Sequence, residues 1–255
     1  MHSLTEGGSM DYIYGRNPVI EALRAGRPIN KIMIAKGSHH GSIKEITALA
    51  KQRNILLQNV EKKQLDYFAG DEVHQGVLAQ TASKEYCDWE EVLEEVRLKN
   101  EDPLFLILDG VEDPHNLGAV LRTSDAAGVH CVIIPKHRAV PLTTGVAKAS
   151  AGAIEFVPVA RVTNIAQTID RLKDKGCWIM GTDPVAKQNL FSTDLKGPLV
   201  IVLGSENKGL SKLVKDKCDV LLNIPMQGKL NSLNVSVAAA VILYEIVRQR
   251  TGDYK

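Results

Sequence analysis

The sequence of 255 residues lacks any apolar run near the roughly 20 residues that a membrane-spanning helix needs. Its amino end also lacks a basic segment followed by an apolar core, so we expect no signal peptide. The seven histidines have no metal-ligand spacing; His39 and His40 fall in a turn, where we expect them to be solvated. Cysteine is scarce, and the four that occur are far apart: Cys87, Cys131, Cys177 and Cys218. We therefore expect neither a disulfide framework nor a metal site, and a reducing cytoplasm as the location.

Net charge is also nearly absent. The formal charge of +1 argues against a strongly basic nucleic-acid binder, and nothing indicates DNA or a membrane as a partner. The distribution is uneven, because residues 86–102 contain seven acidic and two basic residues, with a mildly basic balance on either side. That balance is compatible with RNA binding without demonstrating it.

Three common motifs are missing. There is no Gly-x-Gly-x-x-Gly dinucleotide fingerprint and no Gly-x-Ser-x-Gly nucleophile elbow. Gly204 and Gly209 have the spacing of a phosphate-binding P-loop, but Lys208 precedes the second glycine and no Lys-Ser/Thr pair follows it. Nucleotide hydrolysis and acyl transfer are therefore not expected.

Composition and periodicity divide the chain into four parts. We interpret them as a flexible extension at 1–11, a small α/β domain at 12–83, an acidic linker at 84–103 and a larger α/β domain at 104–255. In the small domain we expect strands at 31–35, 55–60 and 76–81, and helices at 17–24, 42–53 and 62–69. The linker contains a charged helix at 89–99, which we expect to be a solvated face.

The larger domain alternates short, nearly continuous apolar runs with helical segments. Such runs are typical of strands buried on both faces, so we predict an α/β fold with a mainly parallel sheet and helices on both sides. The expected strands lie at 104–109, 131–135, 156–159, 178–182, 198–203 and 220–224. The expected helices lie at 117–127, 144–151, 164–175 and 235–247.

Three loops of this domain follow such strands, at 109–122, 203–209 and 224–236. In open parallel sheets, ligands bind in the crevice beyond the carboxyl ends of the strands, where loops offer backbone N–H groups. The three loops therefore predict one composite site, and we expect the chain to be an enzyme.

The residues in these loops resemble a known family. Three segments are similar to the three motifs of the SpoU/TrmH family of RNA 2′-O-ribose methyltransferases. They are NLGAVLR at 116–122, GSE and the glycine at 204–209, and IPM followed by SLNVS at 224–236. Other segments resemble the bacterial branch that methylates a guanosine of 23S ribosomal RNA: KASAG at 148–152, RVTN at 161–164, and YE with RQR at 244–250. YGRNP at 14–18 and HQGV at 74–77 are similar to the small RNA-binding domain of that branch.

The resemblance implies an S-adenosylmethionine-dependent homodimeric enzyme whose carboxyl-terminal part forms a trefoil knot, an exception to unknotted topology. It implies cofactor contacts for Leu203, Gly204, Ile224, Met226, Ser232 and Leu233. It implies catalytic positions for Asn116, Arg122, Glu206, Ser232 and Asn234, and RNA contacts for Arg16, Gln75 and Arg122. Glu206 is expected to orient the loops or Asn116 through hydrogen bonds, whereas Ser232 and Asn234 are expected to face the reacting ribose.

The implied reaction is the in-line transfer of a methyl group to a ribose 2′-oxygen. Family proposals assign activation of the hydroxyl to the motif arginine, here Arg122. Because a guanidinium stays protonated in proteins, we expect Arg122 instead to clamp the target phosphate, which could relay the proton, and to stabilise the developing alkoxide. The plainer alternative is an ion pair on a helix surface.

Plainer roles are open for the other site residues as well. Asn116 could cap the helix at 117–127, Glu206 could be a solvated turn residue, and Ser232 and Asn234 could cap the last helix. Asn207 stands where the family usually has glycine; since asparagine is the next most tolerant of a left-handed backbone, we expect the loop to survive.

Three alternatives compete with the 23S target. They are a transfer RNA, a resistance-type ribosomal RNA site, and a catalytically silent RNA-binding assembly factor. The small amino-terminal domain argues against transfer RNA, because relatives of that kind usually lack it. The intact set of motif residues argues against the silent factor.

Overall fold

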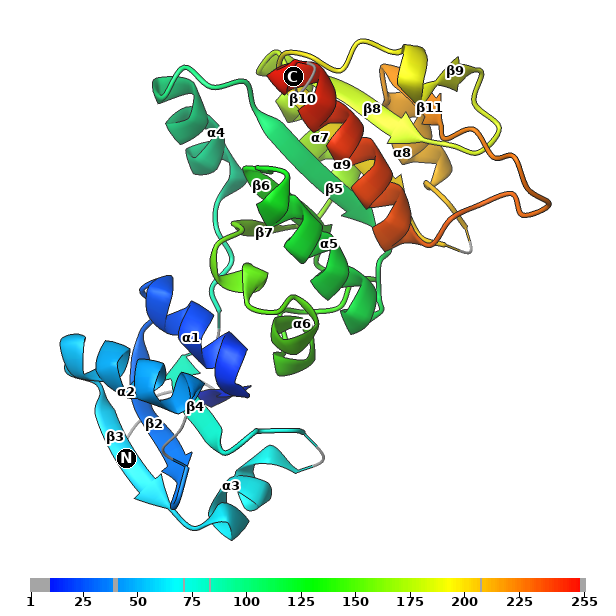
Figure 1. Cartoon of the computed structure of the whole chain (residues 1–255). Helices are drawn as coiled ribbons and strands as arrows, with labels where there is room; N and C mark the ends of the chain where they lie inside the picture. Colours follow the sequence, from blue (N-terminus) through cyan, green and yellow to red (C-terminus); the bar gives the residue numbers. More distant parts are fainter. Residues whose placement is uncertain (1–9, 39–40, 71, 83, 207, 253–255) are drawn as a thin grey trace, which may run out of the picture. The chain divides into compact units, whose positions relative to one another are not determined.

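The computed structural model describes residues 10–38, 41–70, 72–82, 84–206 and 208–252. The chain divides into two compact units, one of Met1–Glu85 with Leu142–Phe156 and the other of Tyr86–Pro141 with Val157–Lys255 (Figure 1). The expectations for residues 1–9, His39, His40 and Asn207 lie outside the described residues.

The first unit is built on a four-stranded sheet in the order β1-β4-β2-β3, in which only β2 and β3 are parallel. Its elements up to the end of the sheet are β1 (Met10–Tyr14), α1 (Arg16–Arg24), β2 (Ile29–Ala35), α2 (Ser42–Gln52), β3 (Leu56–Val60), α3 (Lys62–Ala69) and β4 (Val77–Ala82). The expectation that residues 10 and 11 belong to a flexible extension is wrong, because Met10 and Asp11 pair with Ala82 and Thr81 in the sheet. Strand β1 is not predicted from the sequence, because its first residues precede the first clear alternation of apolar and polar residues.

Strand β2 shows how this sheet is packed on both faces. Ile32 and Ile34 are buried in one apolar cluster with residues of α1 and α2, whereas Met33 and Ala35 belong to a second cluster on the side of α3. Successive side chains of a strand point to opposite faces, so one strand serves both clusters.

The segment Leu142–Phe156 corrects the predicted domain boundary. We expected it in the larger domain, but its helix α6 (Thr144–Ala149) and the short helix η1 (Ala153–Glu155) belong to the first unit. Glu155 forms a buried ion pair with Arg27, and Lys148 pairs with Glu72 at 2.9 Å. These contacts join positions far apart in the sequence, so periodicity alone could not reveal them.

The second unit contains a seven-stranded sheet in the order β7-β6-β5-β10-β8-β11-β9, and every described pairing in it is parallel. Its strands are β5 (Leu104–Asp109), β6 (Cys131–Pro135), β7 (Val159–Val162), β8 (Trp178–Thr182), β9 (Gln188–Asn189), β10 (Leu199–Gly204) and β11 (Val220–Asn223). Its helices are α4 (Trp89–Leu98), α5 (Pro114–Ala126), α7 (Ile165–Asp174), α8 (Lys212–Lys217) and α9 (Val235–Thr251), with a short helix η2 (Leu190–Ser192). The predicted parallel sheet is confirmed, although the strand expected at 156–159 starts three residues later.

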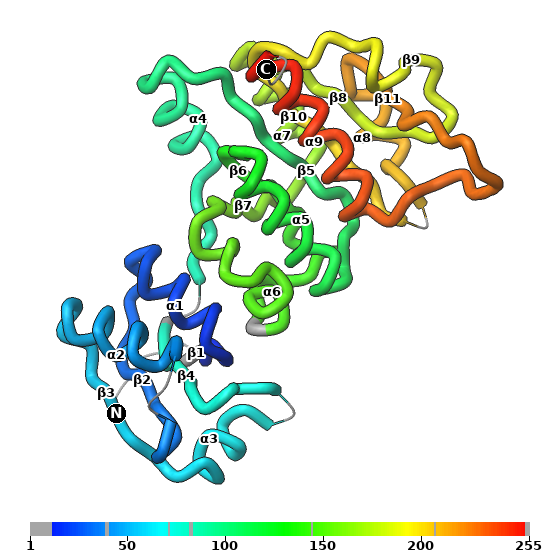
Figure 2. The backbone as a smooth tube through the Cα atoms, in the orientation of Figure 1, coloured from blue at the N-terminus to red at the C-terminus, as the bar shows by residue number. Residues whose placement is uncertain are grey.

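Helices cover both faces of this sheet, as predicted. Phe105 and Ile107 of β5 pack in a cluster with residues of α4, α7 and α8. The alternate residues of β5 point to the other face, where α5 and α9 pack against each other (Figure 2). The carboxyl end of β5 therefore lies beside the start of α9.

Helix α4 is not the solvated linker helix that its charge suggested. Trp89, Leu93 and Val96 are buried, and the first two belong to the main cluster of the second unit. The acidic face is partly neutralised, since Glu90 pairs with Arg171. The charge run occupies only the outer face of an amphipathic helix that packs on the sheet. No helix in the described part of the chain is long and apolar enough to cross a membrane.

Candidate active site

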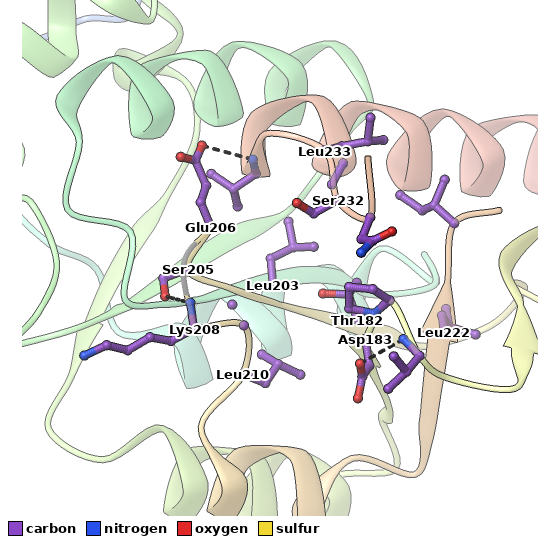
Figure 3. Close-up of a pocket in the computed structure, with 18 of the residues that line it drawn as sticks. Thr182, Asp183, Leu203, Ser205, Glu206, Lys208, Leu210, Leu222, Ser232 and Leu233 are labelled. Carbon is purple, nitrogen blue, oxygen red and sulfur yellow. Dashed lines mark hydrogen bonds between the residues drawn. The ribbon is translucent and has the colours of Figure 1, made fainter. Parts of the chain in front are cut away.

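Two cavities lie at the carboxyl ends of β5, β8, β10 and β11. The first encloses about 380 Å³ (Figure 3). All six residues expected to touch the cofactor line it: Leu203, Gly204, Ile224, Met226, Ser232 and Leu233. The structure thus brings together residues from two loops that are separated by a helix and a strand.

Gly204 is required by the close approach of its own loop. A Cβ at this position would lie 2.1 Å from the backbone carbon of Gly209. Gly209 has a φ of +61° and donates its backbone N–H to the carbonyl of Ser205 at 2.8 Å. The loop between them is therefore a tight turn that no side chain at 204 could accommodate.

The sequence reasoning missed residues that line the first cavity from the end of β8. Thr182 ends this strand and Asp183 follows it, and Lys215 of α8 forms an ion pair with Asp183. The hydrogen bond from Lys215 lowers the pKa of the Asp183 carboxyl, which also accepts the backbone N–H of Val185 at 3.1 Å. The position of Asp183 at a strand end was the signal that could have identified it.

The second cavity, of about 420 Å³, adjoins the first and shares Glu206 and Lys208 with it. Asn116 lines it from α5, and Arg138 from the loop after β6, where it lies 3.9 Å from Asp109. Most of its lining residues have polar or charged side chains, whereas several leucine and isoleucine side chains line the first cavity. A reacting polar group could therefore enter beside the apolar cavity.

A hydrogen-bond network stands between the two cavities. Glu206 Oε1 accepts a hydrogen bond from Asn116 Nδ2 at 3.0 Å, and Asn234 Nδ2 donates to Asn116 Oδ1 at 3.0 Å. Asn234 also donates to Glu206, and so does the backbone N–H of Val235 at 3.4 Å. The hydrogen bond expected between Glu206 and Asn116 is confirmed, and one residue from each of the three loops takes part.

The plainer capping roles are only partly found. Helix α5 begins at Pro114 with Asp113 as its cap, so the prediction of Asn116 as the N-cap is wrong. Asn234 does cap α9, because its side chain accepts the backbone N–H of Ser236 at 2.9 Å, and it joins the network as well. Ser232 is exposed and lines the first cavity instead of capping the helix.

Arg122 is not brought into either cavity. It is exposed on α5, and it forms no ion pair among the residues that the structure describes. In the first unit, Arg16 Nε donates to the backbone oxygen of Gln75 at 3.1 Å, and both residues line a cavity of about 800 Å³ with Lys36 and Lys62. No group of three or more histidine, cysteine, aspartate or glutamate residues gathers as a metal site in the described ranges.

Comparisons with known proteins identify the chain. Residues 103–244 match the SpoU rRNA Methylase family, and residues 12–87 match the family described as RNA 2′-O ribose methyltransferase substrate binding. The first match alone covers more than half of the sequence. The chain belongs to the SpoU family.

Three similar proteins cover different shares of this SpoU family member. YacO of Bacillus subtilis, named for the TrmH family of tRNA/rRNA methyltransferases, is 49% identical over 94% of this chain and 96% of its own. The SpoU methyltransferase AviRb of Streptomyces viridochromogenes, solved with the cofactor AdoMet, is 26% identical with a TM-score of 0.80 over 95% of this chain and 91% of its own. The A. aeolicus TrmH/SpoU tRNA modifying enzyme is 32% identical with a TM-score of 0.54, over 62% of this chain and 85% of its own.

This SpoU family member is therefore an RNA methyltransferase that uses S-adenosylmethionine. The first cavity fits that cofactor, since its volume lies in the range of small-molecule sites and its lining combines apolar walls with backbone groups. Leu203, Ile224 and Leu233 supply the apolar walls. Gly204 allows the backbone of Gly209 to pack directly against the wall of this cavity, since a Cβ at 204 would clash with it.

Proposed function

We propose that this enzyme methylates the ribose 2′-oxygen of a guanosine in 23S ribosomal RNA. When bound, S-adenosylmethionine supplies an electrophilic methyl group on a sulfonium. The observation that carries the proposal is the network of Asn116, Glu206 and Asn234 beside the two adjoining cavities. We place the cofactor in the first cavity and the target ribose in the second.

The network positions the groups that touch the ribose. Good alignment of reacting atoms is worth roughly 7–11 kcal/mol of the barrier, so a rigid site supplies much of the catalysis. Glu206 holds Asn116 and the start of α9 through a single carboxylate oxygen. Asn116 then contacts the ribose, Ser232 faces it from the adjoining cofactor cavity, and Asn234 ties the third loop to Asn116 by a hydrogen bond.

Arg122 acts on the RNA phosphate in this mechanism. A protonated guanidinium cannot accept the proton of the hydroxyl, but it can hold a phosphate oxygen and stabilise negative charge on the developing alkoxide. Its exposure on α5 leaves it accessible to a bulky RNA. Arg16 and Gln75 contact a different part of the RNA from the first unit.

The extent of the similarity favours ribosomal RNA over transfer RNA. The solved enzyme named for tRNA modification covers 62% of this chain, whereas the family that matches residues 103–244 is described as SpoU rRNA Methylase. Residues 12–87 match a substrate-binding family, and all but the last two of them belong to the compact first unit. The additional unit offers a second point of attachment for a large RNA.

Helix α9 supports a homodimer. Val237 and Tyr244 are 47% and 53% exposed, and Val241 lies between them on the same row of the helix. Leu230, in the loop before this helix, is 76% exposed. An apolar row of this kind on an otherwise polar surface is typical of a protein interface, and a second copy of the chain is its occupant in this proposal.

Two further features belong to the proposal. In this proposal the carboxyl-terminal chain forms a trefoil knot, which rests on the family to which the chain belongs. The enzyme works in the cytoplasm, in keeping with four free cysteines.

Transfer of labelled methyl groups tests the function. The full chain is incubated with methyl-labelled S-adenosylmethionine and unmodified transcripts of 23S ribosomal RNA or transfer RNA, and ribose methylation is mapped. We expect label on one guanosine of the 23S transcript. Label on transfer RNA alone would contradict the proposed substrate, and no label on any RNA would favour a silent RNA-binding factor.

A further inference from the structure

A third cavity lies on the second unit, at the carboxyl ends of β6 and β7. It encloses about 660 Å³ and is lined by Tyr86, Lys136, Arg161, Asn164 and Arg171, among others. No residue of the three active-site motifs lines it. The RVTN segment at 161–164, which resembles the bacterial 23S branch, does line it.

The third cavity and the active site open on the same edge of the sheet. The strand order runs β7-β6-β5-β10 and all these strands are parallel, so their carboxyl ends form one continuous edge. Neighbouring strands are about 4.8 Å apart, so roughly 14 Å separate the end of β7 from the end of β10. A few nucleotides of an extended RNA strand could span this distance.

Two cations in the third cavity have no carboxylate partner in the part of the chain that the structure describes. Glu90 is occupied by Arg171, and Asp88 caps α4 by accepting the backbone N–H of Glu90 at 2.8 Å. Lys136 and Arg161 are both exposed, and neither forms an ion pair among the described residues. Their charge therefore remains available to an anion.

Arg161 also lies on an aromatic plane. Its guanidinium carbon is 4.5 Å from the centroid of the Tyr86 ring. Guanidinium planes and aromatic rings are the surfaces on which unpaired bases stack in RNA-binding proteins. The pair thus combines a phosphate-binding charge with a stacking surface.

Cations continue along the edge toward the reaction centre. Arg138 follows β6 and Lys208 follows β10, and both line the cavity assigned to the target ribose. Asp109 lies 3.9 Å from Arg138, while Glu206 is engaged in the network with Asn116. The edge therefore carries positive side chains in both the third and the second cavity, although the carboxylates of Asp109, Glu112, Asp113 and Glu206 also line the second.

We propose that Lys136 and Arg161 bind the RNA strand that flanks the target nucleotide, with phosphates on the two cations and an unpaired base stacked on Arg161 and Tyr86. This inference rests on the proposed function and deepens it, because it assigns RNA contacts to the catalytic unit as well as to the first unit. Substrate RNA is then held by residues of both units. Phosphate contacts of this kind make binding strongly dependent on salt.

The test compares two double variants of the full chain that lose the same charge. Lys136→Gln with Arg161→Gln removes the two cations of the third cavity. Lys99→Gln with Lys196→Gln removes two exposed lysines that lie before β5 and β10, at the amino edge of the same sheet. Affinity for unmodified 23S ribosomal RNA and for transfer RNA is measured from 50 to 300 mM salt, and cofactor affinity is measured in parallel.

The Lys136→Gln/Arg161→Gln variant is the carboxyl-edge variant, and the Lys99→Gln/Lys196→Gln variant is the amino-edge variant. At physiological salt, we expect the carboxyl-edge variant to bind its substrate RNA about tenfold more weakly than the wild type. The slope of log affinity against log salt should fall by about 1.4, because each lost contact to single-stranded phosphate contributes about 0.7. Cofactor affinity should remain within twofold, and the amino-edge variant should match the wild type. An Arg161→Lys variant, which keeps the charge but loses the planar stacking surface, should give an intermediate loss.

Two results would overturn the inference. One is wild-type RNA affinity and salt slope in the carboxyl-edge variant. The other is an equal loss in both double variants, since net charge would then explain the effect. Failure of the proposed function is a separate outcome, because it appears as absence of methyl transfer by the wild type, whereas a selective loss of RNA affinity would still support this binding site.

Discussion

Glu206 Oε1 accepts a hydrogen bond of 3.0 Å from Asn116 Nδ2, although the two residues are 90 positions apart in the sequence. The same oxygen accepts the backbone N–H of Val235 at 3.4 Å. One carboxylate oxygen therefore links the loop after β10 to the start of α5 and to the start of α9. The site depends on a few polar contacts, which substitutions can remove one at a time.

Asn116→Ala should lower kcat by about 100-fold or more, because removal of one positioned hydrogen-bonding group at a reaction centre typically costs that much. Cofactor affinity should stay within twofold, since Asn116 lines the second cavity and not the first. Single-turnover methyl transfer and calorimetry measure the two quantities. His115→Ala, exposed one residue earlier on α5, serves as the control. Wild-type kcat in Asn116→Ala would remove this residue from the mechanism.

Arg122→Ala should reduce methyl transfer by at least about 100-fold while cofactor binding survives, because the guanidinium acts on the RNA and not on the cofactor. Initial rates at saturating RNA and cofactor titrations provide the measurements. Asp125→Ala is the matched control, as Asp125 is exposed on the same helix one turn later. Full activity of Arg122→Ala would contradict the assignment and leave this arginine as an ordinary surface residue.

Gly204→Ala should weaken S-adenosylmethionine binding by at least about tenfold, because overpacking against backbone costs 1–3 kcal/mol or more. The added Cβ would lie 2.1 Å from the carbon and 2.4 Å from the oxygen of Gly209. Gly228→Ala is the control, since nothing lies within 4 Å of a Cβ at that position. Calorimetric titration of both variants decides the matter, and equal affinities would show that the turn at 204 can relax.

The Asp183–Lys215 pair should contribute a pH-dependent share of stability. The hydrogen bond from Lys215 lowers the pKa of Asp183 from its ordinary value of 3.8. A carboxyl with a lowered pKa in the folded state stabilises the protein above the unfolded value, and this contribution is lost as the pH falls through the folded value. The difference in free energy of unfolding between wild type and Asp183→Asn should therefore be constant near neutrality and shrink below about pH 4.

Urea unfolding at several pH values measures this difference. Asp216→Asn is the control, because Asp216 is exposed on α8 and lies one residue from Lys215. Its effect should be small and nearly independent of pH. A difference for Asp183→Asn that persists unchanged at pH 3 would show that the ion pair does not set the stability of this loop.

Val237→Glu combined with Tyr244→Glu should convert a dimer into a monomer, because two carboxylates on one row of α9 cannot be desolvated against a second copy. Light scattering coupled to gel filtration reports the mass. Leu213→Glu, at a position 59% exposed on α8, controls for adding charge at an exposed apolar site. A wild type that is already monomeric at micromolar concentration would contradict the proposed interface.

Several elements were predictable because their signals are local. The expected bounds of β5, β6, β8 and α3 agree with the structure, since each is a short apolar run or an amphipathic turn between clear breakers. The start of α5 was predicted three residues late because Asp113, not Asn116, caps it. Helix α4 was taken for a linker because its acidic face dominates the composition, while burial of Trp89 depends on the sheet beneath it.

The sequence by itself determined the three loops, six of the residues that line the cofactor cavity and the resemblance to a methyltransferase family, because motif residues and strand-end loops are local patterns along the chain. Only the tertiary structure decided that Glu206 joins Asn116 to Asn234 and that Leu142–Phe156 packs in the first unit. It also decided that Lys136 and Arg161 share an edge with the reaction centre. The physical reason is strand order: β5 lies between β6 and β10, and no local pattern in the sequence encodes which distant strands become neighbours.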